Sequence, residues 1–281
     1  MRRILFLLMF LGFSPLGADG EDDFLEDVAH KWQARATKTQ AGQPKWSVPM
    51  VAPFPQLAQV FRTDITRQEM PSGATNWNIG SGKGFNFIPF ANTQVDVLLP
   101  GYVLHGDGGR DGFGDMTLLG KYRFAAGNEQ HGNYILSGAL SWTITTGSHK
   151  NGAASSILTP TLLAGKGYGR LAIMSSLGGG SPISHTATTG RTILWNTVAQ
   201  YHVKKHLWPE LELNSTSYMG GTRDGKTQMF LTPGIMFGRF ALRPESAKSR
   251  LGVAAGVAFQ TAVTSFHTYN HAGVVSLRFA F

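Results

Sequence analysis

A serine and two histidines lie close together near the end of the chain, and such residues can form a hydrolase site. Ser265, His267 and His271 stand within the sequence SFHTYNH. A serine hydrolase needs a nucleophile, a histidine as general base, and a third group that orients the histidine. The sequence shows neither an acidic or amide partner nor an oxyanion hole beside them. We therefore predict that the protein is not an enzyme, with a barrel hydrolase that uses Ser265 kept as an alternative.

Three aspartates in a glycine-rich stretch offer carboxylates to a cation. Asp107, Asp111 and Asp115 occur in HGDGGRDGFGD, residues 105–115. Calcium requires several oxygen ligands around one centre, and this spacing matches no defined calcium loop. The chain has no cysteine, which excludes a thiolate metal site and a disulfide framework. A surface loop is the favoured interpretation, and we predict neither a metal nor a cofactor.

A third set of residues is charged and falls at positions that share one face of alternating segments. Opposite charges on a common face can select a solute by its charge, can bind the acidic helix start at Glu21, Asp22 and Asp23, or can neutralise one another as ordinary ion pairs. These interpretations stay open, and the elements that position the set must decide where it lies. The set is Arg62, Asp64, Asp96, Asp115, Lys121, Arg123, His202, Lys204, Glu210, Glu212 and Arg278.

The elements that carry these charges are predicted to be long strands. In YILSGALSWTIT, residues 134–145, large apolar residues alternate with Ser, Thr and Ala, and a strand places the two sets on opposite faces. A small, polar inner face is typical of a transmembrane barrel rather than a soluble sandwich. The sequence predicts an all-β fold: a transmembrane antiparallel up-and-down β-barrel of about twelve strands. The predicted spans are 56–69, 84–91, 93–105, 113–126, 133–147, 155–166, 169–182, 190–204, 208–221, 226–241, 249–265 and 269–281.

The last residues, GVVSLRFAF, read as the strand that closes this barrel. Val275, Leu277, Phe279 and Phe281 share one apolar face. An unpaired strand edge in lipid is costly, so this strand is expected to pair with the first one. Phe279 and Phe281 resemble the C-terminal signal of outer-membrane barrels, which implies that the barrel-assembly machinery is a partner.

The chain before the barrel divides into two parts. Residues 1–18 have two arginines, a short apolar run and small residues, which is the pattern of a secretory signal peptide. Residues 19–55 are predicted to be a periplasmic helix and linker, and residues 56–281 the barrel. Phe24, Val28 and Trp32 have helical spacing and are candidates for plugging the lumen. Deletion of residues 19–45 is then expected to raise pore conductance.

The charge balance bears on partners. The chain of 281 residues has a formal charge of +8, with 42% hydrophobic and 15% charged residues. Its basic residues alternate with apolar ones instead of forming a patch, so we predict no nucleic-acid partner. Contact of outward basic loops with lipopolysaccharide phosphates explains the charge more simply. The expected partners are outer-membrane lipid and lipopolysaccharide, and the expected state is a monomer.

Several stretches resemble a known family. They include GKGFNFIPFANTQVDVLLPGYV (82–103), DGFGDMTLLGKYRFAAGNEQHGNYILS (111–137) and WNTVAQYHVKKHLWPELELNST (195–216). They are similar to the "MetA-pathway of phenol degradation" family of transporter-like outer-membrane barrels, which is related to the secretion channel for functional amyloid. The resemblance implies a Gram-negative outer-membrane barrel that moves some solute and has no enzyme activity.

These observations predict a channel or transporter in the bacterial outer membrane that passes a small solute of an aromatic or hydrophobic kind. A non-conducting structural or adhesive barrel and the barrel hydrolase are the alternatives.

Overall fold

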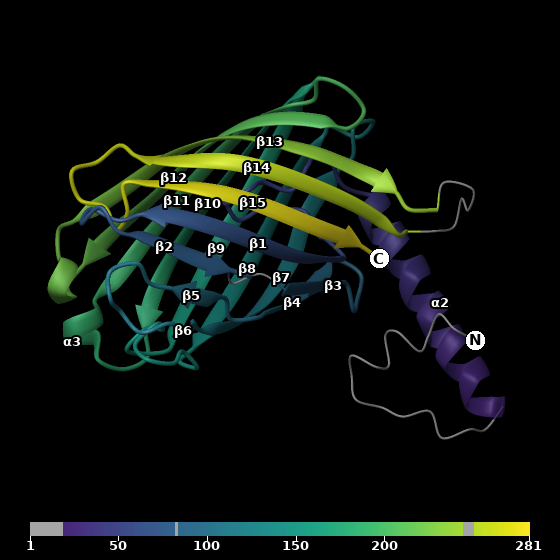
Figure 1. Ribbon diagram of the computed structural model, residues 1–281. Coiled ribbons are helices and arrows are strands. Elements are labelled where there is room, and N and C mark those ends of the chain that lie inside the picture. Colours follow the sequence, from purple (N-terminus) through teal and green to yellow (C-terminus); the bar gives the residue numbers. More distant parts are fainter. Residues whose placement is uncertain (1–18, 82–83, 244–249) are drawn as a thin grey trace.

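The alternating segments of the chain form strands of one closed antiparallel sheet. The computed structural model describes residues 19–81, 84–243 and 250–281, and the predicted signal peptide, residues 1–18, lies outside them. Each strand pairs with its neighbour, and β15 pairs with both β14 and β1, which closes the barrel (Figure 1). The strands are β1 (Val60–Glu69), β2 (Thr75–Ile79), β3 (Gly84–Phe87), β4 (Thr93–Leu98), β5 (Tyr102–Leu104), β6 (Gly112–Phe113), β7 (Met116–Gly127), β8 (Tyr134–Ile144), β9 (Ile157–Tyr168), β10 (Leu171–Pro182), β11 (Arg191–Tyr201), β12 (Leu207–Met219), β13 (Thr227–Ala241), β14 (Gly252–Ala262) and β15 (His271–Ala280).

The fifteen strands form twelve passes across the barrel wall, which we call staves; a stave consists of one long strand or of two strands in line. Three staves are each made of two strands: β2 with β3, β4 with β5, and β6 with β7. β2 and β3 both pair with β1. β3 then pairs with β4 and β2 with β5, and β4 pairs with β7 and β5 with β6. The prediction of a twelve-stranded transmembrane barrel is confirmed. The second predicted span, 84–91, was wrong in its bounds, because the stave begins at Thr75 with a short polar strand and ends at Phe87. The first span also starts four residues later than predicted, at Val60.

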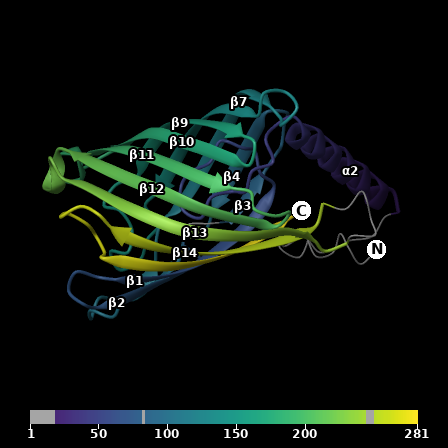
Figure 2. The ribbon, with the colours of Figure 1, turned by 90° about the horizontal axis from the view of Figure 1, so that it is seen from above.

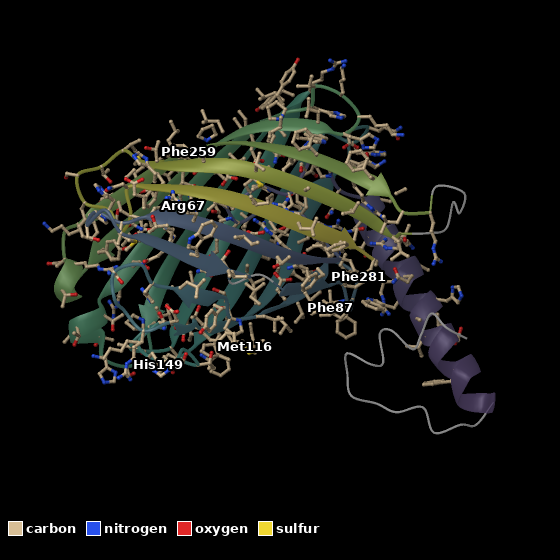
Figure 3. All side chains as sticks on the ribbon, viewed as in Figure 1. Arg67, Phe87, Met116, His149, Phe259 and Phe281 are labelled. Carbon is tan, nitrogen blue, oxygen red and sulfur yellow. The ribbon has the colours of Figure 1, made fainter. Side chains whose placement is uncertain are left out.

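The two faces of the barrel differ in the way that the alternation predicts. On β8, Ile135 and Ser137 are buried inside, whereas Leu140 and Trp142 are exposed on the outer surface. Phe259 of β14 likewise stands on the outside (Figure 3). An apolar outer face suits the hydrocarbon core of a bilayer, where each backbone polar group must be satisfied within the sheet.

The two ends of the barrel also differ. β1 begins and β15 ends at the end that bears helix α2 (Asp19–Ala41), which an even-numbered barrel places in the periplasm (Figure 1). Turns at this end are mostly short, such as the turn between β9 and β10, where Gly169 has φ +60°. Longer connections at the opposite end include residues 145–156 and 263–270. That end also carries α3 (Thr186–Thr189) and the 3-10 turn η1 (Gly221–Arg223).

Helix α2 lies outside the barrel and projects away from its periplasmic end (Figures 1 and 2). Trp32 fixes it there: its indole Nε1 donates to Ile88 O at 2.9 Å, and its ring centroid lies 6.1 Å from Phe87 and 6.3 Å from Phe281. Phe87 and Phe281 lie beside one another at this end (Figure 3). In the described part of the chain, no helix is long and apolar enough to cross a membrane.

Candidate functional site

The lumen at the periplasmic end is occupied by the segment that joins α2 to β1. We call residues 43–59 the lumen segment; none of them belongs to a helix or a strand. Prolines at 44, 49, 53 and 55 prevent regular structure there. Met50, Ala52 and Leu57 are nevertheless almost completely buried. A chain without secondary structure carries unpaired backbone donors and acceptors, so the barrel wall must supply their partners.

Two glutamates of β12 accept hydrogen bonds from the lumen segment. Glu210 Oε1 accepts from Met50 N at 2.8 Å. Glu212 accepts from Val51 N at 2.9 Å and from Ala52 N at 2.6 Å, one bond to each carboxylate oxygen. Both side chains are buried, so these contacts replace the water that the carboxylates would otherwise require.

Two arginines on the adjacent wall bind the carbonyl groups just before that point. Arg62 of β1 donates from Nη1 to Pro49 O at 3.1 Å and from Nη2 to Met50 O. Arg278 of β15 donates from Nη2 to Pro49 O at 2.7 Å and from Nη1 to Val48 O. Arg62 also forms a buried ion pair with Asp64 at 2.7 Å. The N–H groups of the segment therefore donate to carboxylates of the wall, and its carbonyl groups accept from guanidinium groups of the wall.

The opposite wall holds the later residues of the lumen segment. Lys121 Nζ of β7 donates to Phe54 O at 2.9 Å and to Gln56 O at 3.1 Å, and it lies 4.0 Å from the Phe54 ring centroid. Ser137 Oγ of β8 donates to Pro55 O at 2.7 Å. Gln94 Oε1 of β4 accepts from Ala58 N at 2.6 Å. Side chains from strands on several sides of the barrel thus bind one stretch of main chain.

Apolar contacts seat two side chains of the segment against glycines of the wall. A Cβ atom added at Gly165 of β9 would lie 2.5 Å from Cζ3 of Trp46, and one at Gly256 of β14 would lie 2.5 Å from Sδ of Met50. The absence of a side chain at these two inward positions therefore makes room for Trp46 and Met50.

Replacing Gly165 with valine should displace Trp46 and loosen the lumen segment. Overpacking of this kind costs about 1–3 kcal/mol, which corresponds to roughly fivefold to hundredfold in the equilibrium between seated and released segment. Gly120→Val is the matched control, because a Cβ at Gly120 meets nothing within 4 Å. The measurement is the open-time fraction in a planar bilayer. An equal response of the two variants would contradict the role given to Trp46.

The middle of the lumen carries neutral hydrogen-bonding side chains across five neighbouring strands. These bonds form one continuous ladder, whose last member, Tyr269, lies in the loop before β15. Burial raises the pKa of Tyr269 to about 12, so its hydroxyl stays protonated and donates. The bonds run Asn196–Ser176 (3.1 Å), Asn214–Asn196 (3.1 Å), Thr232–Asn214 (3.1 Å), Gln260–Thr232 (3.2 Å) and Tyr269–Gln260 (3.0 Å).

The structure brings together seven of the residues that the sequence singled out for the lumen. The other four lie elsewhere. Asp115 is at the opposite end, where it accepts from Gly147 N and Ala153 N of a long loop. His202 stacks on Trp208 at 4.0 Å near the periplasmic rim, Lys204 is exposed there, and Arg123 donates to Thr39 O at the end of α2. The seven inside are Arg62, Asp64, Asp96, Lys121, Glu210, Glu212 and Arg278.

The plug predicted on the helix must be corrected. Phe24 is 66% exposed and Val28 46% exposed, and Trp32 packs on the rim. The lumen segment fills the barrel instead, so a deletion that ends at residue 45 leaves most of it in place. Sequence reasoning missed this segment and its partners Gln94 and Ser137. The signal was the cluster of four prolines among apolar residues in a stretch read as a linker.

The other two candidate sites form ordinary loop structure. His267 Nδ1 lies 2.8 Å from Thr264 O, and Nε2 lies 3.0 Å from Asn270 Oδ1, so both ring nitrogens are engaged within their own loop. Asp111 accepts from His105 N, and Asp107 accepts from Gly109 N. Within residues 19–81, 84–243 and 250–281, no group of His, Asp and Glu could hold a metal ion.

The lumen segment leaves space at the periplasmic mouth. A cavity of about 430 Å³ lies between it and the wall, lined by Trp46, Trp208, Arg239 and Arg250 among others. Burial and the charge of Arg239 lower the pKa of Arg250 to about 10. Arg250 binds Thr37 Oγ1 and Gln40 Oε1, which ties the end of α2 to the barrel rim.

Solved structures share this architecture. An outer-membrane channel from Pseudomonas putida F1 aligns with a TM-score of 0.55 and 13% identity over 84% of this chain and 100% of its own. The NanC porin gives 0.51 and 7%, over 80% and 99%. The translocator domain of the autotransporter NalP from Neisseria meningitidis gives 0.51 and 12%, over 94% and 98%. At these identities the likeness concerns the fold.

No family model and no curated protein matches the sequence. The specific resemblance to the MetA-pathway family therefore stays a prediction. The closed twelve-stranded barrel with its apolar outer face defines the class of protein: a bacterial outer-membrane β-barrel.

Proposed function

We propose that the protein is an outer-membrane channel whose lumen is closed by residues 43–59 and opens when this segment leaves. One observation carries the proposal: the wall binds the segment largely through its main chain, by hydrogen bonds to groups that a solvated chain would pair with water. Water entering the lumen can replace each of these bonds. The closed state is therefore reversible without unfolding of the barrel, whose strands are held by their own ladders.

The lumen wall favours a hydrophilic solute over the aromatic or hydrophobic one that the resemblance implies. Once the segment has left, the path is bordered by ionised side chains near the periplasm and by Asn, Gln, Ser and Thr side chains further in. Such groups lose hydrogen bonds with water when an apolar solute passes, which costs free energy. A polar solute replaces those bonds.

The test is solute entry into liposomes that contain the folded barrel. The barrel without residues 19–58 should admit a small neutral sugar, detected by swelling, whereas the full chain should admit little. A barrel that shows a heat-modifiable band, and so is folded, but excludes the sugar in both forms would contradict the channel and favour the non-conducting structural barrel.

A further inference from the structure

We propose that the lumen is a binding site for an extended, proline-rich polypeptide other than the chain's own segment, which occupies the site in the closed state. The inference rests on the proposed function, because another polypeptide can enter only when residues 43–59 have withdrawn.

What the wall recognises is main chain. Carbonyl groups of six residues accept from the wall: those of Val48, Pro49, Met50, Phe54, Pro55 and Gln56. N–H groups of four residues donate to it: those of Met50, Val51, Ala52 and Ala58. These groups occur in every polypeptide, so the hydrogen bonds do not depend on the side chains of the bound segment, whereas Trp46 and Met50 add apolar packing on the wall.

The spacing of the wall groups fits a chain that makes no secondary structure of its own. Carboxylates of Glu210 and Glu212 take three successive N–H groups, while Arg62 and Arg278 take the carbonyls beside them. A helix would already have used these groups in its own hydrogen bonds. A proline-rich chain keeps its carbonyls free and has fewer N–H groups to satisfy, which matches the excess of carbonyl contacts.

A wall built for a small ion or sugar would not need this arrangement. The groups that bind the segment lie on opposite sides of the barrel, with Lys121 and Ser137 facing the strands of Glu212 and Arg278 across the bound segment. They are joined only by a ligand long enough to reach both walls. Main-chain groups of one continuous polypeptide satisfy all of them at once.

The experiment uses the folded barrel without residues 19–58 and two labelled synthetic peptides. One has the sequence of residues 43–59. The other keeps the four prolines in place and scrambles the remaining residues. Fluorescence anisotropy in detergent reports binding, and block of the current in a planar bilayer reports that binding occurs in the lumen. Both peptides should bind and should block the current.

Substitutions in the wall locate the site. Glu212→Gln should weaken binding of both peptides about tenfold or more, because it removes the charge from two hydrogen bonds. Glu69→Gln is the matched control: Glu69 lies on β1 with the opposite parity to Arg62 and has no hydrogen bond to the lumen segment. It should change nothing.

The possible results separate this inference from the channel itself. If only the native sequence binds, or neither peptide binds, the lumen is merely a latch for its own segment and the inference fails. If both peptides bind but the folded barrel never conducts, the peptide site stands and the channel is wrong. Equal losses from Glu212→Gln and Glu69→Gln would place the binding outside the lumen and overturn the inference.

Discussion

Removal of residues 19–58 should turn a closed barrel into one that conducts in discrete steps. The deleted residues include every main-chain group that the wall binds, so the lumen fills with water while the strand pairs stay intact. The measurement is single-channel current in a planar lipid bilayer, with the full chain beside the deleted one.

A shorter deletion is the matched control. Removal of residues 19–45 takes away α2 but leaves residues 46–59, with Met50 to Ala52 still bound to Glu210 and Glu212. We expect this variant to remain mostly closed. If it conducts as well as the longer deletion, the helix holds the channel shut and the lumen segment does not.

The same open channel should show only weak charge selectivity. The seven charged residues that lie together inside the lumen include three cations and four anions. The cations are Arg62, Lys121 and Arg278, and the anions are Asp64, Asp96, Glu210 and Glu212. These charges largely cancel when water screens them in the open lumen. A reversal potential close to zero in a salt gradient, with a slight preference for cations, is the expected result. Strong anion selectivity would show that the cluster does not line the path.

The sequence allowed the barrel to be predicted because period-two alternation records which side of each strand meets lipid. That signal is strong in long strands such as β8 and weak in β2, whose residues TNWNI carry little contrast between faces. The missed strand β2 follows from this. Gly84, which begins β3, was assigned correctly, but β2, the earlier part of the same stave, was not.

The site was predicted in part, for a related reason. Alternation places Glu212 and Arg278 on the inner face, but it does not say what they meet there. Their partners, Ala52 and Pro49, are 160 and 229 residues away in the sequence and lie in a segment with no periodicity. Besides the proline cluster, the charges that an empty lumen would leave without partners could have indicated that something must fill it.

Glu212→Gln should shift the channel toward the open state by weakening the hold of the wall on the lumen segment. Its carboxylate accepts from two successive N–H groups, and glutamine keeps the shape but loses the charge and offers one carbonyl oxygen in place of two. The loss of one charge-assisted hydrogen bond is worth about 1.5–3 kcal/mol. This corresponds to roughly tenfold to hundredfold in the equilibrium between closed and open channel.

The measurement is the open-time fraction of the full chain. Glu69→Gln is the control, because it makes the same replacement at a glutamate that does not bind the lumen segment. A second comparison distinguishes the binding of the lumen segment by Glu212 from a direct effect of Glu212 on the permeation path. In the barrel without residues 19–58 there is no segment for Glu212 to bind, so the substitution should no longer alter the open-time fraction. If Glu212→Gln raises it equally in both backgrounds, Glu212 acts on the permeation path and not by holding residues 51 and 52 in the lumen.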